Sequence, residues 1–178
     1  SSALIFRFLE SLSSTGPRFP GLAALRLAGS PLSPQMVRTL MRRVTPNIVN
    51  DYGSTEVGLT ASGDRDFLLR RPGAVGRLMP WVEAQTVDDG GAPLADGSPG
   101  VLRFRGTGYP TTYLGEHESG AGEFRDGWFY PGDYGRVLPD RALIVASRVD
   151  EMINLGGTKV APGEVERVLL QDPAVREA

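Results

Sequence analysis

The sequence contains no cysteine and a single histidine, His117, among its 178 residues. Disulfide bonds, thiolate metal sites and histidine clusters are therefore excluded. No apolar run approaches the roughly 20 residues that cross a bilayer. The opening segment Ala3-Leu4-Ile5-Phe6 lacks the basic leader of a signal peptide. We therefore expect a cytoplasmic protein without a membrane span.

Positive charge is not in excess either, because the formal net charge is −2. A protein that binds nucleic-acid phosphates normally shows a basic surplus, so we expect no nucleic-acid partner. All but one of the 19 basic side chains are arginine, and Lys159 is the only lysine. Chemistry that needs an ammonium group must therefore use Lys159 or come from outside this chain.

Residues 1–74 alternate between helix and strand patterns, which predicts an α/β segment. We expect helices over 3–12 and from Pro34 to Val44, the second capped by Ser33. Short strands are expected at 25–28 and 48–49. Two such strand–helix units predict the edge of a parallel α/β sheet.

The rest of the chain changes character. Short apolar runs separated by Gly, Pro and Asp predict strands at 81–87, 101–105, 135–138 and 142–146, and hence a small β-barrel subdomain over 75–149. Residues 150–178 contain one clear helix, which opens at Pro162. About thirty residues cannot build a core by themselves. We therefore expect them to be a hinge and the start of a truncated C-terminal α+β lid domain.

Three short motifs combine residue types that carry chemistry. Asn50-Asp51-Tyr52-Gly53-Ser54-Thr55-Glu56-Val57-Gly58 follows a strand and offers a hydroxyl for phosphate and a carboxylate for Mg²⁺. The same residues equally suit a turn and a helix capped by Thr55. Gly127-Trp128-Phe129-Tyr130-Pro131-Gly132-Asp133 presents a carboxylate that can accept bonds from two neighbouring hydroxyls, or forms a simple Pro-Gly-Asp turn. The stretch 147–166 places Arg148 and Asp150 before a glycine pair, which fits a mobile loop or a solvated linker.

Taken together and in this order, the motifs resemble those of the adenylate-forming superfamily, which includes acyl-CoA synthetases, luciferases and peptide-synthetase adenylation domains. Tyr-Gly-Ser-Thr-Glu resembles the phosphate and magnesium loop of that family, and Trp-Phe-Tyr-Pro-Gly-Asp resembles its ribose loop. The segment from Arg148 resembles the family's hinge. Ala28-Gly29-Ser30-Pro31-Leu32-Ser33 resembles its adenine segment, so the likeness covers nearly the whole chain.

This resemblance implies roles for the nucleotide-binding residues. Gly29, Ser30 and Pro31 would line the adenine, Asn50 would read its amino group and Tyr52 would stack on it. Asp51, Gly53 and Ser54 would complete the same element.

The resemblance also implies the chemistry. Thr55 would bond the α-phosphate and Glu56 would hold Mg²⁺. Asp133 would bind the ribose hydroxyls with help from Arg148, and Asp150 would be the hinge of the lid. Gly156 and Gly157 would lie in a loop that enters the site in the second step.

The function implied is part of an ATP-dependent acyl-CoA ligase, with ATP or AMP, Mg²⁺, a carboxylic acid and coenzyme A as ligands. Ser54 and Pro131 depart from the residues usual in peptide-synthetase domains and so favour the CoA ligase. The alternatives are a peptide-synthetase adenylation fragment, a non-catalytic nucleotide-binding or interaction module, and a β-rich domain with accidental motif matches.

Two further expectations follow from parts that the sequence lacks. It has no Ser/Thr/Gly-rich, lysine-containing phosphate loop, and Lys159 does not match the family's catalytic lysine, so we expect the 178 residues alone to be inactive. A truncated α/β edge would leave Met36, Leu40 and Val44 uncovered, so we also expect self-association.

Overall fold

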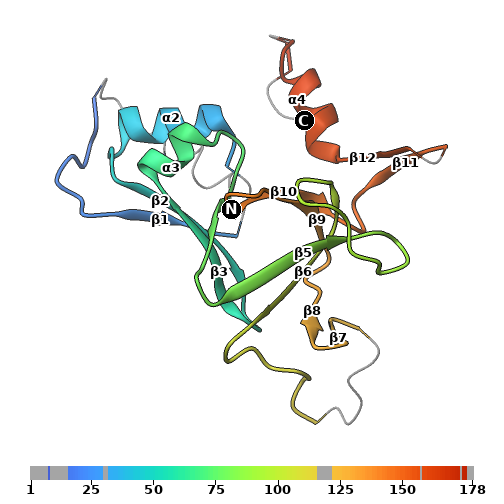
Figure 1. Cartoon of the computed structure of the whole chain (residues 1–178). Coiled ribbons are helices and arrows are strands. Elements are labelled where there is room, and N and C mark those ends of the chain that lie inside the picture. The colour runs from blue at the N-terminus through green and yellow to red at the C-terminus, as the bar shows by residue number, and fades with distance from the viewer. Residues whose placement is uncertain are drawn as a thin grey trace.

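The computed structural model describes residues 8, 16–29, 32–115, 122–156, 158–172 and 174–175. Apart from Phe8, the helix expected over 3–12 lies outside these residues. Figure 1 shows two helices, α2 (Pro34–Arg43) and α3 (Arg65–Arg70), side by side next to the strands β1 (Leu25–Leu27) and β2 (Ile48–Ser54). The strands from β5 (Val82–Val87) onward lie in the other half of the molecule.

The first unit follows the predicted pattern. β1 (Leu25–Leu27) leads into α2 (Pro34–Arg43), and β2 (Ile48–Ser54) returns parallel to β1. The Ser33 hydroxyl accepts a hydrogen bond from the Met36 amide at 3.1 Å and so caps α2. Pro34 is the first residue of the helix, where proline is favoured. The predicted cap and the predicted parallel pair are both confirmed.

The next segment differs from the prediction. β2 does not end at Val49 but continues through the Asn-Asp-Tyr-Gly-Ser motif and pairs antiparallel with β3 (Gly58–Asp64). Residues 55–57 form the turn between these strands, so the expected alternative of a helix capped by Thr55 is wrong. The helix that follows, α3 (Arg65–Arg70), begins later and is capped by the Asp64 carboxylate, which accepts the Phe67 amide at 2.8 Å.

The strands join into one ten-stranded sheet with the order β1-β2-β3-β4-β10-β9-β6-β8-β7 and with β5 on β6. In the described residues this path does not return on itself, so the sheet is open and the predicted barrel is not closed. Among the strands of the described residues, β1 and β2 are the one parallel pair. The strands not yet given bounds are β4 (Gly76–Leu78), β5 (Val82–Val87), β6 (Gly100–Gly106), β7 (Phe124–Arg125), β8 (Trp128–Phe129), β9 (Asp133–Val137) and β10 (Ala142–Arg148).

The expected alternation is visible in β6. Leu102 and Phe104 are buried on one face, and Arg103 and Arg105 lie on the other over the Trp128 ring. The predicted hairpin of β9 and β10 is also confirmed.

The last segment has a small sheet of its own. β11 (Ile153–Leu155) and β12 (Thr158–Val160) form a two-stranded sheet, followed by α4 (Pro162–Leu169). Figure 1 shows α4 above the end of β10. Its apolar side chains Val165, Val168 and Leu169 are between 41% and 58% exposed.

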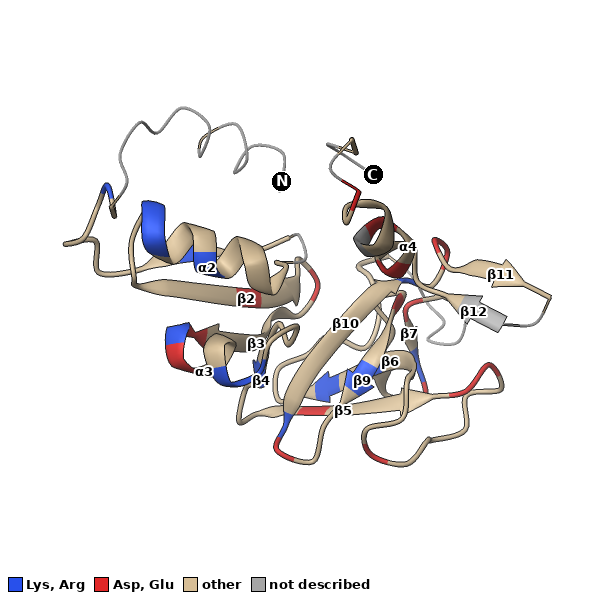
Figure 2. Ribbon diagram, turned by 90° about the horizontal axis from the view of Figure 1, so that it is seen from above, with Lys and Arg blue, Asp and Glu red and all other residues tan. Residues whose placement is uncertain are grey.

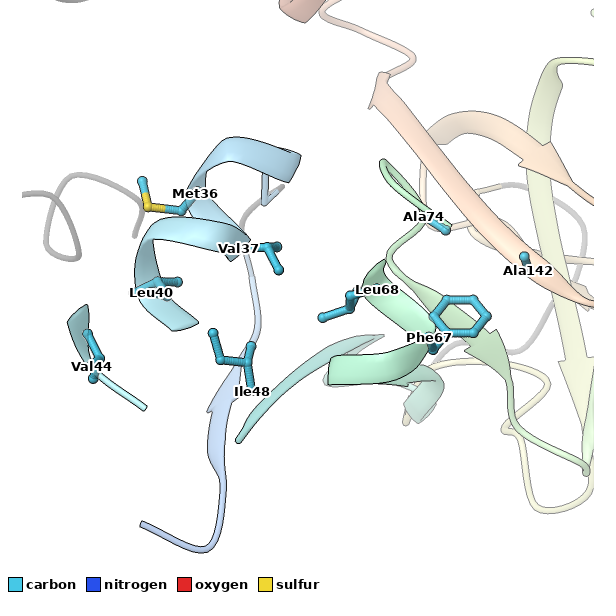
Figure 3. Packing of buried hydrophobic residues seen from close by; sticks show 9 residues of the cluster. All are labelled: Met36, Val37, Leu40, Val44, Ile48, Phe67, Leu68, Ala74 and Ala142. Atoms are coloured by element: carbon cyan, nitrogen blue, oxygen red, sulfur yellow. The ribbon is translucent and has the colours of Figure 1, made fainter. Parts of the chain in front are cut away.

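The first core lies between α2, α3 and the sheet. Figure 3 shows Val37, Leu40, Ile48 and Leu68 pointing into the same space between these elements. Met36, Leu40 and Val44 are at most 7% exposed, so the expectation that they would be uncovered is wrong. The reason is that β1, β2 and α3 of this chain cover that face of α2.

No helix in the described part of the chain is both long and apolar enough to cross a membrane. Figure 2 shows basic and acidic segments interspersed along the ribbon, with basic residues at the end of α2 and acidic residues in several turns. This mixture agrees with the near-zero net charge.

Burial at Leu40 predicts a large effect of truncation. Leu40 is 1% exposed, and Leu40→Ala should lower the free energy of unfolding by about 2–5 kcal/mol because it leaves a cavity. The matched control is Leu114→Ala, since Leu114 is fully exposed and its loss should change the free energy by less than about 0.5 kcal/mol. Urea unfolding followed by tryptophan fluorescence measures both, and equal effects would contradict the packing described.

Candidate functional site

The first motif lies on a hairpin and not at a strand end. Asn50 to Ser54 occupy the second half of β2, and the register with β3 shifts between Tyr52 and Gly53. A Cβ on Gly53 would lie 2.0 Å from the carbonyl oxygen of Gly58 across the hairpin. Only glycine therefore fits at Gly53, and the close approach fixes how residues 54–57 leave the sheet.

Tyr52 and Asp133 join the first two motifs although 81 residues separate them. The Tyr52 hydroxyl donates to Asp133 Oδ2 at 2.5 Å, and Asp133 is only 8% exposed. The Tyr52 ring packs against Phe104, with 5.8 Å between ring centroids. Burial, and then the neighbouring negative charge of Asp133, raise the pKa of Tyr52 well above its ordinary value. The phenol is therefore a permanent donor to the carboxylate.

Arg148 brings the third motif to the same carboxylate. It lies opposite Asp133 in the β9–β10 register, and its Nη1 donates to Asp133 Oδ1 at 3.2 Å and to the Pro131 carbonyl at 2.5 Å. The Val149 amide donates to the Gly132 carbonyl at 2.8 Å. The loop 131–133 is therefore held by the end of β10.

Gly132 makes room for this arrangement. Its φ is +80°, and a Cβ there would lie 2.8 Å from Arg148 Nη2. Any other residue would be strained in this conformation and would also push the guanidinium away from the loop. The glycine of the Pro-Gly-Asp sequence thus serves both the turn and the placement of Arg148.

Glu56 projects from the turn between β2 and β3, next to the exposed Thr55. The Ser54 hydroxyl, and to a lesser degree the Tyr113 hydroxyl 3.5 Å away, hold the pKa of Glu56 below its ordinary value. The Ser54 oxygen is buried and makes no hydrogen bond of ordinary geometry within the described residues. A buried hydroxyl without a good partner normally has one in the functional state.

Two other residues of the first motif have partners within the protein. The Asn50 side-chain amide donates to the Val75 carbonyl at 2.8 Å, and Asn50 is 3% exposed. Asp51 accepts two bonds from Arg26, at 2.8 and 3.0 Å, and one from Ser62 at 2.7 Å. Both side chains therefore tie β2 to its neighbours.

The remaining predicted residues are more scattered. Gly29 follows β1 with a φ of +77°, while Ser30, Pro31 and Gly157 lie outside the described residues. Asp150 is an exposed residue, with 3.8 Å between its Oδ1 and Arg148 Nε. Gly156 has a φ of +60° and lies between β11 and β12.

Two residues near Glu56 were not predicted from the sequence. The Tyr113 hydroxyl donates to the Glu123 carboxylate and also approaches Glu56. Tyr113 lies 57 positions after Glu56, and no spacing or composition marks the pair. Only the fold brings them together.

The residues present fit a nucleotide and a divalent cation. A carboxylate at Asp133 can accept bonds from vicinal hydroxyls, and Glu56 supplies a carboxylate beside the buried Ser54 hydroxyl. The described residues contain no cluster of three acidic, histidine or cysteine ligands. Mg²⁺ binds through one or two carboxylates together with substrate phosphates and water, and Glu56 can supply one such carboxylate.

Sequence comparison places the chain in a family. The model of the family described as AMP-binding enzyme matches residues 3–114. The indoleacetate–CoA ligase of Aromatoleum aromaticum is 32% identical over 88% of this chain and 31% of its own length. The luciferin 4-monooxygenase of Photinus pyralis is 34% identical over 84% of this chain and 28% of its own length. The chain thus spans about a third of these relatives.

Solved structures have the same fold. The amide bond synthetase McbA of Marinactinospora thermotolerans superposes with a TM-score of 0.76 at 29% identity, over 87% of this chain and 32% of that one. The O-succinylbenzoate coenzyme A synthetase of Bacillus subtilis, solved in complex with ATP and magnesium ion, gives a TM-score of 0.78 at 24% identity. That match covers 98% of this chain and 36% of the synthetase. The motifs, the fold and the match over residues 3–114 together lead to one conclusion: the chain belongs to the AMP-binding enzyme family, the adenylate-forming superfamily that includes acyl-CoA ligases.

Proposed function

We propose that the chain is part of an ATP-dependent acyl-CoA ligase, which activates a carboxylic acid as acyl-AMP and transfers the acyl group to coenzyme A. The observation that supports this most is the convergence of Tyr52 and Arg148 on the Asp133 carboxylate. Three motifs that are distant in the sequence meet at one buried acceptor, which is what binding of a single AMP moiety requires. Relatives that bear the names of CoA ligases support the same reaction class.

Three groups of residues bind the AMP end of the substrate. Asp133 accepts the ribose hydroxyls, assisted by Arg148, and the Tyr52 ring stacks on the adenine. Gly29, Ser30 and Pro31 line the base through their backbone. Asn50 reads the adenine amino group with its side-chain oxygen, which is an acceptor, while its amide nitrogen keeps the bond to the Val75 carbonyl.

At the phosphate end, Thr55 donates to the α-phosphate and Glu56 holds Mg²⁺. The substrate carboxylate attacks the α-phosphorus and pyrophosphate leaves, so donors and cation must meet the negative charge on the phosphoryl oxygens. Bound Mg²⁺ supplies part of this positive charge. A depressed pKa keeps Glu56 ionised at neutral pH, which is the form that binds a cation.

The three parts of the chain divide this work. Residues 1–74 carry the phosphate loop, 75–149 the ribose loop, and 150–178 form the hinge and the start of a lid. Asp150 is the hinge residue, and closure of the lid excludes water from the reactive anhydride. Val165, Val168 and Leu169 of α4 are the exposed apolar residues available for contact with a second copy or with further chain.

The acceptor of the acyl group can differ from one matched protein to another. The matched proteins include one named luciferin 4-monooxygenase and one named amide bond synthetase, so the family also takes acceptors other than a thiol. The second candidate is a nucleotide-binding module that keeps the fold without the catalysis. Both candidates need Asp133, and only the first forms acyl-AMP.

Nucleotide binding should depend on Asp133. Asp133→Asn in the full-length protein should weaken AMP binding at least about 10-fold, since a charged acceptor contributes roughly 1.5–3 kcal/mol. The matched control is Asp140→Asn, because Asp140 is also paired with an arginine, Arg71, but lies at the opposite end of the β9–β10 hairpin. Isothermal titration calorimetry measures both affinities. Equal losses in the two variants would refute the ribose role.

Catalysis should require more than these 178 residues. Full-length protein should catalyse ATP–pyrophosphate exchange with a suitable carboxylic acid, and the 178-residue chain should give none because Lys159 is its only lysine. Exchange followed by coenzyme A consumption supports the ligase, and exchange without it identifies another acceptor. Absence of exchange with a broad panel of acids, despite measurable AMP binding, would favour the non-catalytic module.

A further inference from the structure

The Tyr113 phenol connects two carboxylates at the phosphate end of the site. Its hydroxyl donates to Glu123 Oε2 and lies 3.5 Å from Glu56 Oε1. Glu56 belongs to the turn after β2, whereas Tyr113 and Glu123 come from the segments between β6 and β8. The phenol is thus the contact through which this second region reaches Glu56.

Tyr113 is itself held in place. Its ring packs edge-on against Phe124, with 5.1 Å between centroids and 78° between planes, and Phe124 is 5% exposed. The backbone carbonyl of Glu123 accepts the Tyr130 amide at 2.6 Å, immediately before the loop 131–133. A ring anchored on a buried aromatic residue gives its hydroxyl a fixed position, which a flexible glutamate side chain lacks.

The phenol has a single proton, which its hydroxyl can turn toward either carboxylate. In the structure the hydroxyl donates to Glu123 Oε2, and rotation about its C–O bond brings the same proton toward Glu56 Oε1, 3.5 Å away.

We propose that Tyr113 is a positioning residue that orients the Glu56 carboxylate toward a divalent cation, with Glu123 holding the phenol. This proposal rests on the proposed function, in which Glu56 is the Mg²⁺ ligand. Partners that orient a ligating carboxylate typically change metal affinity about 10- to 100-fold when they are removed. Tyr113 would do so without touching the cation.

The test measures how much Mg²⁺ strengthens ATP binding to the full-length protein. Calorimetric dissociation constants for ATP are taken with EDTA and with saturating Mg²⁺, and their ratio is the Mg²⁺ effect. Tyr113→Phe should reduce this ratio about 10-fold and leave the Mg²⁺-free constant unchanged. Glu123→Gln, a change at an exposed side chain, should reduce it in the same direction because the amide holds the phenol less firmly than the carboxylate.

Tyr109→Phe is the matched control. It removes a phenol hydroxyl from the same loop, but this one pairs with Thr60 at 3.1 Å and not with Glu56, so the Mg²⁺ effect should stay as in the unmodified protein. Glu56→Gln should abolish the effect. The double variant Tyr113→Phe/Glu56→Gln should be no worse than Glu56→Gln alone, because Tyr113 acts through Glu56.

The outcomes separate the two proposals. If Glu56→Gln abolishes the Mg²⁺ effect but Tyr113→Phe and Glu123→Gln leave it intact, the positioning role is wrong and the metal role of Glu56 stands. If Tyr113→Phe weakens ATP binding equally with and without Mg²⁺, its role is structural only. If Glu56→Gln leaves the Mg²⁺ effect intact, the metal role in the proposed function fails and the Tyr113 proposal falls with it.

Discussion

A single buried carboxylate organises the site. Asp133 is 8% exposed, and a charge so enclosed is tolerated only when its oxygens are satisfied by donors. Tyr52 satisfies one oxygen and Arg148 the other, so β2, β9 and β10 must meet at this point. The order of the sheet, in which β3 and β4 connect β2 to β10, is the route by which they do so. Loss of either donor would leave a buried charge partly unpaired, and this makes the geometry of the site part of the stability of the fold.

Two positions of the site have no room for a side chain. At Gly53 and Gly132 the space that a Cβ would occupy is filled, by the Gly58 carbonyl in the first case and by the Arg148 guanidinium in the second. The first close contact shapes the hairpin that carries Glu56, and the second lets Arg148 lie across the loop 131–133. Glycine in both motifs therefore has a steric cause within this chain, independent of any ligand.

Sequence reasoning succeeded where local chemistry decides the structure. The Ser33-Pro34 cap, the alternation along β6 and the β9–β10 hairpin each follow from residues within a few positions of one another. It failed at β2, because Asn-Asp-Tyr-Gly-Ser suits a turn locally while pairing with β3 extends it as a strand. It also missed Tyr113, whose contact with Glu56 spans 57 positions and depends wholly on tertiary structure. The family resemblance assigned Tyr52 to the adenine and Asp133 to the ribose of one nucleotide, but neither it nor any local pattern predicts the direct hydrogen bond between them.

Arg148 links the proposed nucleotide site to the segment beyond it. Its Nη1 is 3.2 Å from Asp133 and its Nε is 3.8 Å from Asp150, so one guanidinium faces both the proposed ribose acceptor and the proposed hinge residue. The Asp133 contact is shorter and partly buried, whereas Asp150 is 80% exposed, and the first is therefore the stronger of the two. A ribose that takes over the Asp133 oxygens would weaken that stronger contact and shift the guanidinium toward Asp150. Binding at Asp133 would therefore change the surroundings of Asp150 through the Arg148 side chain alone, without any change in the sheet.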